Sequence, residues 1–188
     1  LTAWFALAET GGLRAGETVL IHGTGGVALF GLQIARMHGA QAIVVTGSES
    51  KRAQVQALGA SHVLARDGDW PAEVRRLTQG RGADHVLELA SGPNLDRSLQ
   101  ALRQGGRVSI IGMLEGETLS ASFYAMVLGR ATVQGIGVGH RRALEDLVRA
   151  IDVNALRPVI AAHYDFDALP AALDHLARGP FGKIVVTP

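Results

Sequence analysis

A glycine-rich turn near the start of the chain has the spacing that binds phosphate groups. The apolar run Thr18–His22 leads into Gly23-x-Gly25-x-x-Ala28, and apolar residues recur at helical spacing from Val27 onward. A helix that begins at such a turn presents free N–H groups and a partial positive charge, and both attract phosphate. In the dinucleotide fingerprint Gly23 makes the turn, Gly25 admits the pyrophosphate, and the small Ala28 lets the helix pack on the strand. Glycine also suits any tight strand-to-helix turn, so the prediction of a dinucleotide site depends on the strand before the motif and the helix after it.

The residues expected to hold the adenosine end of the dinucleotide favour a 2′-phosphate. Proteins that bind NAD usually carry an Asp or Glu about 20 residues after the turn, at the end of the second strand. That place holds the segment 45–48, Val-Thr-Gly-Ser, and the first acid after it is Glu49. The cations Lys51, Arg52 and Arg66 lie near this edge in the expected fold; alternatively, they form a solvated charged face with Glu49. We therefore expect NADP(H) in preference to NAD(H), which is the alternative.

The order of elements predicts a doubly wound α/β fold, the Rossmann fold. Short apolar runs alternate with helical patterns of about 10 to 15 residues, which is typical of right-handed βαβ crossovers and a parallel sheet. Six strands of this sheet are expected at residues 18–22, 42–46, 62–64, 85–89, 107–111 and 132–137. A helix at 141–151 follows, and a domain boundary is expected near Asn154. The tail carries strands at 159–162 and 184–187 around a helix at 168–178, and we expect these strands to pair with a domain outside this chain.

Composition excludes several classes of function. With 18 basic and 17 acidic side chains the net charge is +1, so the chain lacks a field that would hold a nucleic acid. It contains no cysteine, which excludes disulfides, thiolate zinc ligands and a cysteine nucleophile within it. No apolar run approaches the roughly 20 residues that span a bilayer, so no membrane partner is expected and the cytoplasm is the expected location. The chain begins at Leu1 within a helical pattern, which indicates a piece of a longer protein.

No catalytic or metal-binding constellation is visible, so the catalytic residues stay unassigned. The seven histidines form no His-x-x-x-His pair and have no thiolate partner, so no metal site is predicted. His22, directly before Gly23, is expected at most to cap the turn. A short-chain dehydrogenase would need a Tyr-x-x-x-Lys pair, which neither Tyr124 nor Tyr164 provides. A methyltransferase would need an acid at the end of the second strand, and that acid is missing.

Several motifs together resemble the cofactor-binding half of the medium-chain dehydrogenase/reductase superfamily. The matching segments lie at residues 23–27, 33–35, 39–40, 58–60, 80–84, 105–106, 112, 135–139 and 181–185, so the resemblance covers the whole chain. The chain is most similar to the alcohol dehydrogenase-like and quinone oxidoreductase-like branches. The resemblance implies that residues 1–154 form an NAD(P)-binding Rossmann domain with its leading helix. It also implies that residues 155–188 return to a GroES-like catalytic domain that is missing from the chain.

The resemblance further implies which residues contact the cofactor. In chain order they are Gly23, Gly25, Gly26, Val27, Thr46, Gly47, Ser48, Lys51, Arg66, Ala90, Ser91, Ile111, Gly112, Met113, Gly135, Ile136 and Gly137. Segment 25–27 matches the pyrophosphate cradle, and the loop at 90–91 lies beneath the ribose in the family. Segment 111–113 approaches the nicotinamide there, and segment 135–137 lies beside it.

Four of these positions carry a more specific expectation or an alternative. Gly47 and Lys51 match positions that contact the 2′-phosphate in NADPH-using quinone oxidoreductases. Arg66 stands where those relatives often have a tyrosine, and it is suited to the same phosphate. Met113 is alternatively an ordinary core-filling side chain.

The resemblance implies hydride transfer between NADP(H) and an alcohol or carbonyl, an enone or a quinone, so the partner is a small-molecule substrate. Any zinc ligands and proton-relay residues would lie before Leu1, so zinc is undecided and this chain alone is expected to be inactive. The alternative from another class is a nucleotide-binding module that senses NADP(H) without turnover. We expect a homodimer through the edge of the sixth strand, unless the segment after Gly137 folds back over that edge.

Overall fold

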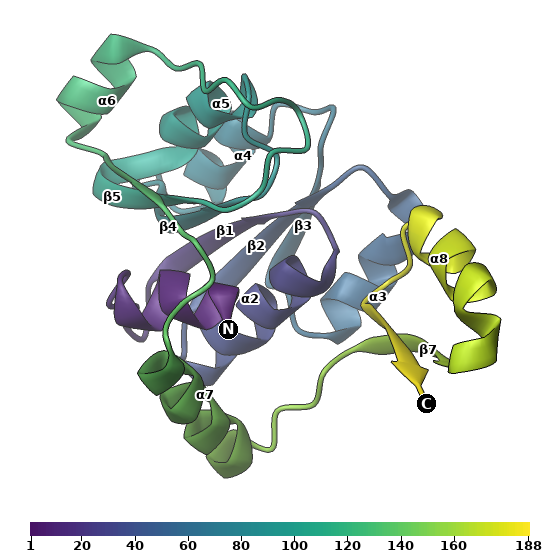
Figure 1. The fold of residues 1–188 in the computed structure, drawn as a ribbon. Helices are drawn as coiled ribbons and strands as arrows, with labels where there is room; N and C mark the ends of the chain where they lie inside the picture. The colour runs from purple at the N-terminus through teal and green to yellow at the C-terminus, as the bar shows by residue number, and fades with distance from the viewer.

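A six-stranded parallel sheet forms the centre of the computed structural model, which describes all residues from 1 to 188 (Figure 1). Its strands are β1 (Thr18–His22), β2 (Gln41–Thr46), β3 (His62–Ala65), β4 (Ala83–Glu88), β5 (Leu102–Ile110) and β6 (Thr132–Gly135). They lie in the order β3-β2-β1-β4-β5-β6, and every neighbouring pair is parallel. The chain thus winds from β1 to one edge and from β4 to the other, which confirms the expected doubly wound fold.

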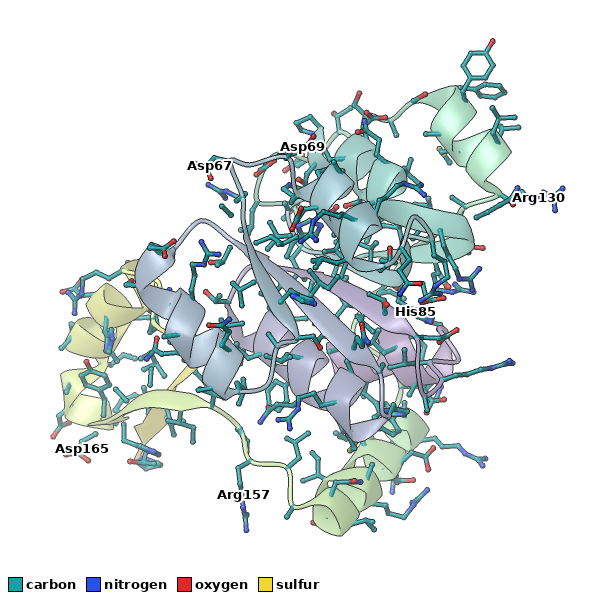
Figure 2. All side chains as sticks on the ribbon, turned by 180° about the vertical axis from the view of Figure 1, so that it is seen from behind. Asp67, Asp69, His85, Arg130, Arg157 and Asp165 are labelled. Carbon is teal, nitrogen blue, oxygen red and sulfur yellow. The ribbon has the colours of Figure 1, made fainter.

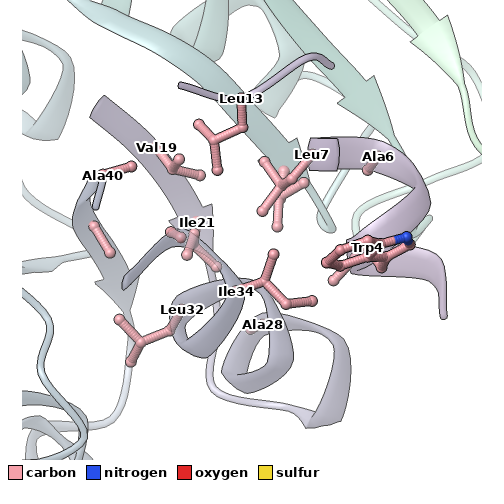
Figure 3. Packing of buried hydrophobic residues seen from close by; sticks show 14 of the residues in the cluster. Trp4, Ala6, Leu7, Leu13, Val19, Ile21, Ala28, Leu32, Ile34 and Ala40 are labelled. Carbon is pink, nitrogen blue, oxygen red and sulfur yellow. The ribbon is translucent and has the colours of Figure 1, made fainter. Parts of the chain in front are cut away.

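Helices cover both faces of the sheet in two apolar layers. The first layer receives α1 (Thr2–Trp4), the π-helical turn η1 (Phe5–Glu9), α2 (Gly26–Met37), α3 (Arg52–Ala57) and α7 (Arg141–Asn154); the second receives α4 (Trp70–Leu77), α5 (Asn94–Ala101) and α6 (Phe123–Gly129). Successive residues of β1 point to opposite layers, Ile21 to the first and Leu20 to the second. Figure 3 shows the first layer, where Trp4 and Leu7 pack near Ile34 of α2. Because helices cover both faces, β1 and β4 are buried along their whole length. The carboxyl ends of these two strands are therefore packed within the core.

The strand β5 begins earlier than the sequence predicts. We expected it from residue 107, but it starts at Leu102 and runs through Gly105, whose φ of +71° is one that glycine adopts easily. Its register against β4 shifts between the pairings of Ala83 and His85. Gly105 and Gly106 therefore lie inside an irregular strand.

The tail forms a small sheet of its own. It comprises β7 (Ile160–Asp165), the 3-10 turn η3 (Phe166–Ala168), α8 (Leu169–Ala177) and β8 (Lys183–Thr187). The two strands pair with each other in parallel, with α8 as the crossover, and they lie apart from the main sheet. The two strands thus have each other as partners, which the sequence did not indicate, but each keeps one free edge, so pairing with a domain outside this chain stays a prediction. Their residues are mostly exposed or half-buried.

The sixth strand is an edge strand that pairs only with β5. After Gly137 the chain does not return along β6 but continues into α7, whose Ala143 and Leu147 join the first apolar layer. The alternative in which this segment covers the edge is therefore wrong. No helix of the structure has the length and apolar character needed to cross a membrane.

Candidate cofactor site

All seventeen residues that the sequence indicates for the cofactor lie at one edge of the sheet. Each belongs to the last residue of a strand or to the segment that directly follows it, from the turn after β1 to the segment after β6. Because the strands are parallel, their carboxyl ends meet at the same edge. This edge, at the point between β1 and β4 where the winding reverses, is where doubly wound sheets bind dinucleotides.

The glycine turn leaves open space above the start of α2. Gly23 has a φ of +82°, and Gly25 is extended and immediately precedes the helix. A Cβ on Gly25 would meet no atom within 4 Å, and no side chain caps the helix. The first N–H groups of α2 are therefore available to an anion that approaches closely.

The side chain of a lysine from the tail lies beside this turn. The Nζ atom of Lys183, the first residue of β8, lies 2.7 Å from the position that a Cβ on Gly26 would take. A groove of about 370 Å³ separates the glycine turn from the tail, and Leu173, Leu176 and Ile184 line its tail side. Sequence reasoning recorded Lys183 only as part of a matching segment, because nothing in the local pattern shows that the tail returns to the turn.

Arg66 is the cation that faces the expected adenosine end. It follows β3, and its Nε atom lies 3.4 Å from the position of a Cβ on Gly47. Its Nη1 atom lies 3.8 Å from Oε1 of Glu115, and its side chain is 62% exposed. Arg52 instead pairs with Glu49 at 3.0 Å. The alternative of a solvated charged face with Glu49 thus holds for Arg52. Arg66 is also exposed but pairs with Glu115 and not with Glu49, so its role toward a 2′-phosphate stays a prediction.

Lys51 is already engaged by the tail. Its ammonium group donates a hydrogen bond to the carbonyl of Gly179, just after α8. Thr46 is buried, and its hydroxyl accepts from the backbone N–H of Ser48 at 3.1 Å, which shapes the turn after β2. Lys51 therefore links the adenosine edge to the tail, whereas Arg66 is held only by an exposed ion pair.

The loops after β4 and β5 touch at the other half of the edge. The hydroxyl of Ser91 donates to the carbonyl of Gly112, and a Cβ on Gly112 would lie 2.9 Å from the carbonyl carbon of Leu89. Met113 is 67% exposed, so the core-filling alternative is wrong. The side chain of Ile136 packs into the first apolar layer, so it offers only its backbone to a ligand.

A buried carboxylate, which sequence reasoning missed, organises the loop after β4. Glu88 is 0% exposed and ends β4. Its Oε1 atom accepts from the backbone N–H groups of Ala90 at 2.9 Å and Ser91 at 3.0 Å. The amide of Asn94 donates to both carboxylate oxygens, at 3.1 and 2.9 Å, and the hydroxyl of Ser98 donates to Oε2 at 2.5 Å. One side chain therefore satisfies four donors from the loop and from α5.

His22 belongs to this network. The sequence had suggested that it caps the glycine turn, but its side chain contacts Ser98 and Glu88 instead. Its Nε2 atom lies 3.1 Å from Oγ of Ser98 and 3.7 Å from Oε2 of Glu88. Burial lowers the pKa of His22, although the charges of Glu88 and Glu115 oppose this effect. Because the single hydroxyl proton of Ser98 goes to Glu88, neutral His22 donates its Nε2–H to Ser98.

The lowered pKa of His22 predicts a loss of stability in mild acid. Unfolded His22 takes up a proton near pH 6.5, whereas the folded protein resists it, so the free energy of unfolding decreases as the pH falls below about 6.5. Burial lowers the pKa of His85 as well, so it acts in the same direction. Urea unfolding from pH 8 to pH 5.5 should show a smaller decrease in His22→Gln than in the wild type, whereas His163→Gln, at an exposed site on β7, should match the wild type. An equal decrease in all three proteins would contradict the assignment.

The side chains of this chain do not assemble a zinc site. No group of three or more His, Cys, Asp or Glu side chains converges in a way that could hold a metal ion. The chemistry proposed below therefore assigns no step to a metal held by these residues.

Comparison with known structures finds this arrangement in dehydrogenases. A structure from Sinorhizobium meliloti 1021, provisionally assigned as an alcohol dehydrogenase, is 54% identical with a TM-score of 0.96, over 100% of this chain and 55% of that one. An NAD-dependent alcohol dehydrogenase is 31% identical with a TM-score of 0.90, over 100% of this chain and 56% of that one. A mycobacterial protein complexed with NADPH is 26% identical with a TM-score of 0.85, over 100% of this chain and 62% of that one. The chain thus spans little more than half the length of these relatives.

A family model described as zinc-binding dehydrogenase matches residues 26–152, which is more than half of the chain. The match begins at Gly26, the first residue of α2, and ends in α7, so it contains the carboxyl ends of the five strands β2 to β6. The resemblance to the medium-chain dehydrogenase/reductase superfamily is confirmed. The chain belongs to the zinc-binding dehydrogenase family.

Proposed function

We propose that this chain binds NADP(H) across the carboxyl ends of its strands, as the cofactor-binding part of an oxidoreductase. The observation that carries the proposal is the uncapped start of α2 beneath open space at Gly25, with the ammonium group of Lys183 beside it. Free N–H groups and a cation around a position without a side chain suit a pyrophosphate. In this proposal residues 1–154 form the cofactor domain, and residues 155–188 return to a catalytic domain.

The residues of the site take separate roles in this proposal. The glycine turn and Lys183 hold the pyrophosphate, and Arg66 pairs with the 2′-phosphate. The loops at Ser91 and Gly112 would support the nicotinamide half. When bound, the reduced nicotinamide would supply a hydride to a carbonyl, an enone or a quinone, and the oxidised form would accept one from an alcohol. The chain's own contribution in this proposal is binding and orientation, because no group of its side chains could hold a metal ion.

The preference for NADP(H) rests on Arg66 and on the absence of an acid from the segment 45–48. Relatives of both kinds exist, since one is NAD-dependent and another is complexed with NADPH. A guanidinium that is 62% exposed beside Gly47 favours a phosphate over a ribose hydroxyl. NAD(H) remains the alternative cofactor.

Titration of the 188-residue chain with NADPH and with NADH tests the proposal. We expect a saturable change in nicotinamide fluorescence with NADPH and weaker binding of NADH. We also expect no oxidation of NADPH by quinones or aldehydes, because this chain holds no assigned catalytic residue. The absence of saturable NADPH binding would overturn the proposal, and rapid turnover by this chain would show that the catalytic residues lie within it.

We expect a homodimer because one edge of β6 has no partner strand within the chain. The N–H of Ile136 donates to the carbonyl of Ile110 at 2.9 Å, so by alternation the N–H of Val133 points away from β5, toward the free edge. Val133→Pro should therefore convert a dimer to a monomer without removing a hydrogen bond to β5, whereas Val133→Ala should leave the dimer intact. Sedimentation equilibrium measures both. A wild-type monomer at micromolar concentration would exclude the dimer, and a dimer that survives Val133→Pro would place the interface elsewhere.

A further inference from the structure

The network around Glu88 lies directly under the cofactor edge, yet the proposed binding does not use it. All of its side chains are buried, namely those of His22, Glu88, Asn94 and Ser98. They come from the end of β1, the end of β4 and the helix α5. Burying a carboxylate is costly unless donors surround it, so a fully buried Glu88 with four donors holds its neighbours in one arrangement.

We propose that Glu88 is a positioning residue that fixes the ends of β1, β4 and β5 as one platform beneath the nicotinamide half of the cofactor. The inference rests on the proposed dinucleotide site and deepens it. Glu88 itself touches no ligand in this scheme. It acts through the backbone of the loop that follows β4.

The platform is a continuous chain of hydrogen bonds. At the β1 end, His22, which precedes Gly23, donates to Ser98, and Ser98 donates to Glu88. At the β4 end, Glu88 accepts from the backbone N–H of Ser91 at 3.0 Å. The hydroxyl of Ser91 then donates to the carbonyl of Gly112, which follows β5. Three strand ends are thus connected through one carboxylate.

The backbone conformation of Ser91 indicates that contacts with the network determine the shape of the loop after β4. Ser91 has a φ of +59°, in the left-handed region that residues other than glycine rarely adopt. Such a conformation persists where surrounding contacts determine it, and here the N–H group of the same residue is held by Glu88. The loop therefore depends on the carboxylate for its shape.

The strand order assigns the platform to the nicotinamide half. The adenosine ribose of a bound dinucleotide lies at the end of the second strand, and here β2 lies on one side of β1. The strands β4 and β5 lie on the other side of β1. With the pyrophosphate over the turn after β1, the remaining nicotinamide riboside extends over the loops that Glu88 fixes.

Glu88→Gln tests the proposal because it replaces one acceptor oxygen with an NH₂ group. If the new NH₂ group takes the place of Oε2, it faces the NH₂ group of Asn94, and the hydrogen bond with Ser98 survives only if that hydroxyl reverses its direction, so the variant loses the negative charge and at least the hydrogen bond from Asn94 at this oxygen. We expect NADPH to bind roughly ten- to a hundredfold more weakly, in line with the loss of hydrogen bonds to a charged group. Binding of 2′-phospho-ADP, which lacks the nicotinamide riboside, should weaken less than about threefold, because its contacts lie on the other side of β1.

A second variant keeps the test valid if Glu88→Gln fails to fold. Ser98→Ala retains the carboxylate but removes the link between Glu88 and His22, and it should weaken NADPH selectively in the same way. Ser109→Ala is the matched control, because Ser109 is equally buried in β5 and lies outside the network. Isothermal titration with both ligands and urea unfolding are measured for each protein.

The ratio of the two affinities separates positioning from general stability. Selective loss of NADPH in Glu88→Gln or Ser98→Ala, with Ser109→Ala unchanged, would support the proposal. Equal weakening of both ligands would reveal a merely structural role, and unchanged affinities would show that the platform does not matter; either result would overturn the proposal. Failure of the wild type to bind NADPH would instead overturn the proposed function itself.

Discussion

Gly25→Val is expected to abolish NADPH binding while leaving the free energy of unfolding nearly unchanged. Gly25 has a φ of −78°, which valine adopts, and a Cβ there would meet no atom of the protein within 4 Å. The valine side chain would instead fill the space above the start of α2, where the pyrophosphate must approach the N–H groups. We expect an affinity loss greater than about a hundredfold, or roughly 3 kcal/mol. Fluorescence titration and thermal unfolding of the same protein measure the two effects.

Gly129→Val provides a matched control for this variant. Gly129 ends α6, far from the turn in sequence, and a Cβ there would likewise meet no atom within 4 Å. NADPH should therefore bind to Gly129→Val as it does to the wild type. If Gly25→Val bound NADPH with wild-type affinity, the pyrophosphate could not lie over the glycine turn.

Arg66→Ala is expected to weaken NADPH roughly ten- to a hundredfold and NADH by much less, since only NADPH has a 2′-phosphate to lose. The present partner of Arg66 is Glu115, at 3.8 Å in an exposed pair. Such pairs contribute about 0 to 1 kcal/mol, so a phosphate competes with Glu115 easily. Parallel titrations with the two cofactors give the ratio of affinities.

Arg157→Ala is the control for the loss of one positive charge. Figure 2 shows Arg157 on the segment between α7 and β7, with its side chain directed away from the body of the protein. This variant should leave both affinities unchanged. Equal losses for NADPH and NADH in Arg66→Ala would exclude Arg66 as the 2′-phosphate ligand and would restore NAD(H) as an equal candidate.

The sequence predicts the main sheet well because its signals are local. β-branched runs such as Thr18–His22 are buried on both faces, and glycines end the helices between them. The glycine turn is predicted for the same reason, since its spacing describes one contiguous turn. The start of β5 is not predicted, because Gly105 and Gly106 indicate a break whether the strand continues or stops.

The missed residues depend on contacts between distant segments. Lys183 reaches Gly26 only because the tail folds back, and no periodicity in either segment records that approach. Glu88 ends a buried strand, and an acid in that place is indistinguishable in sequence from a solvated one. The pairing of β7 with β8 was missed because both strands are short and their residues are exposed or half-buried, so their pattern does not reveal a partner.

The attachment of the tail has a consequence for how long a bound cofactor would stay. The tail reaches the adenosine edge and the glycine turn through the side chains of Lys51 and Lys183, and its Phe181 packs against the first apolar layer. A groove of about 370 Å³ lies between the tail and the turn. A dinucleotide in that groove would contact both the glycine turn and the tail. It could then dissociate only when the tail detaches locally from the turn. A ligand at a hundred times its Kd stabilises the form that binds it by about 2.7 kcal/mol. The amide protons of β8 should therefore exchange with solvent more slowly when NADPH is bound, and the dissociation rate of NADPH should follow the opening rate of this segment.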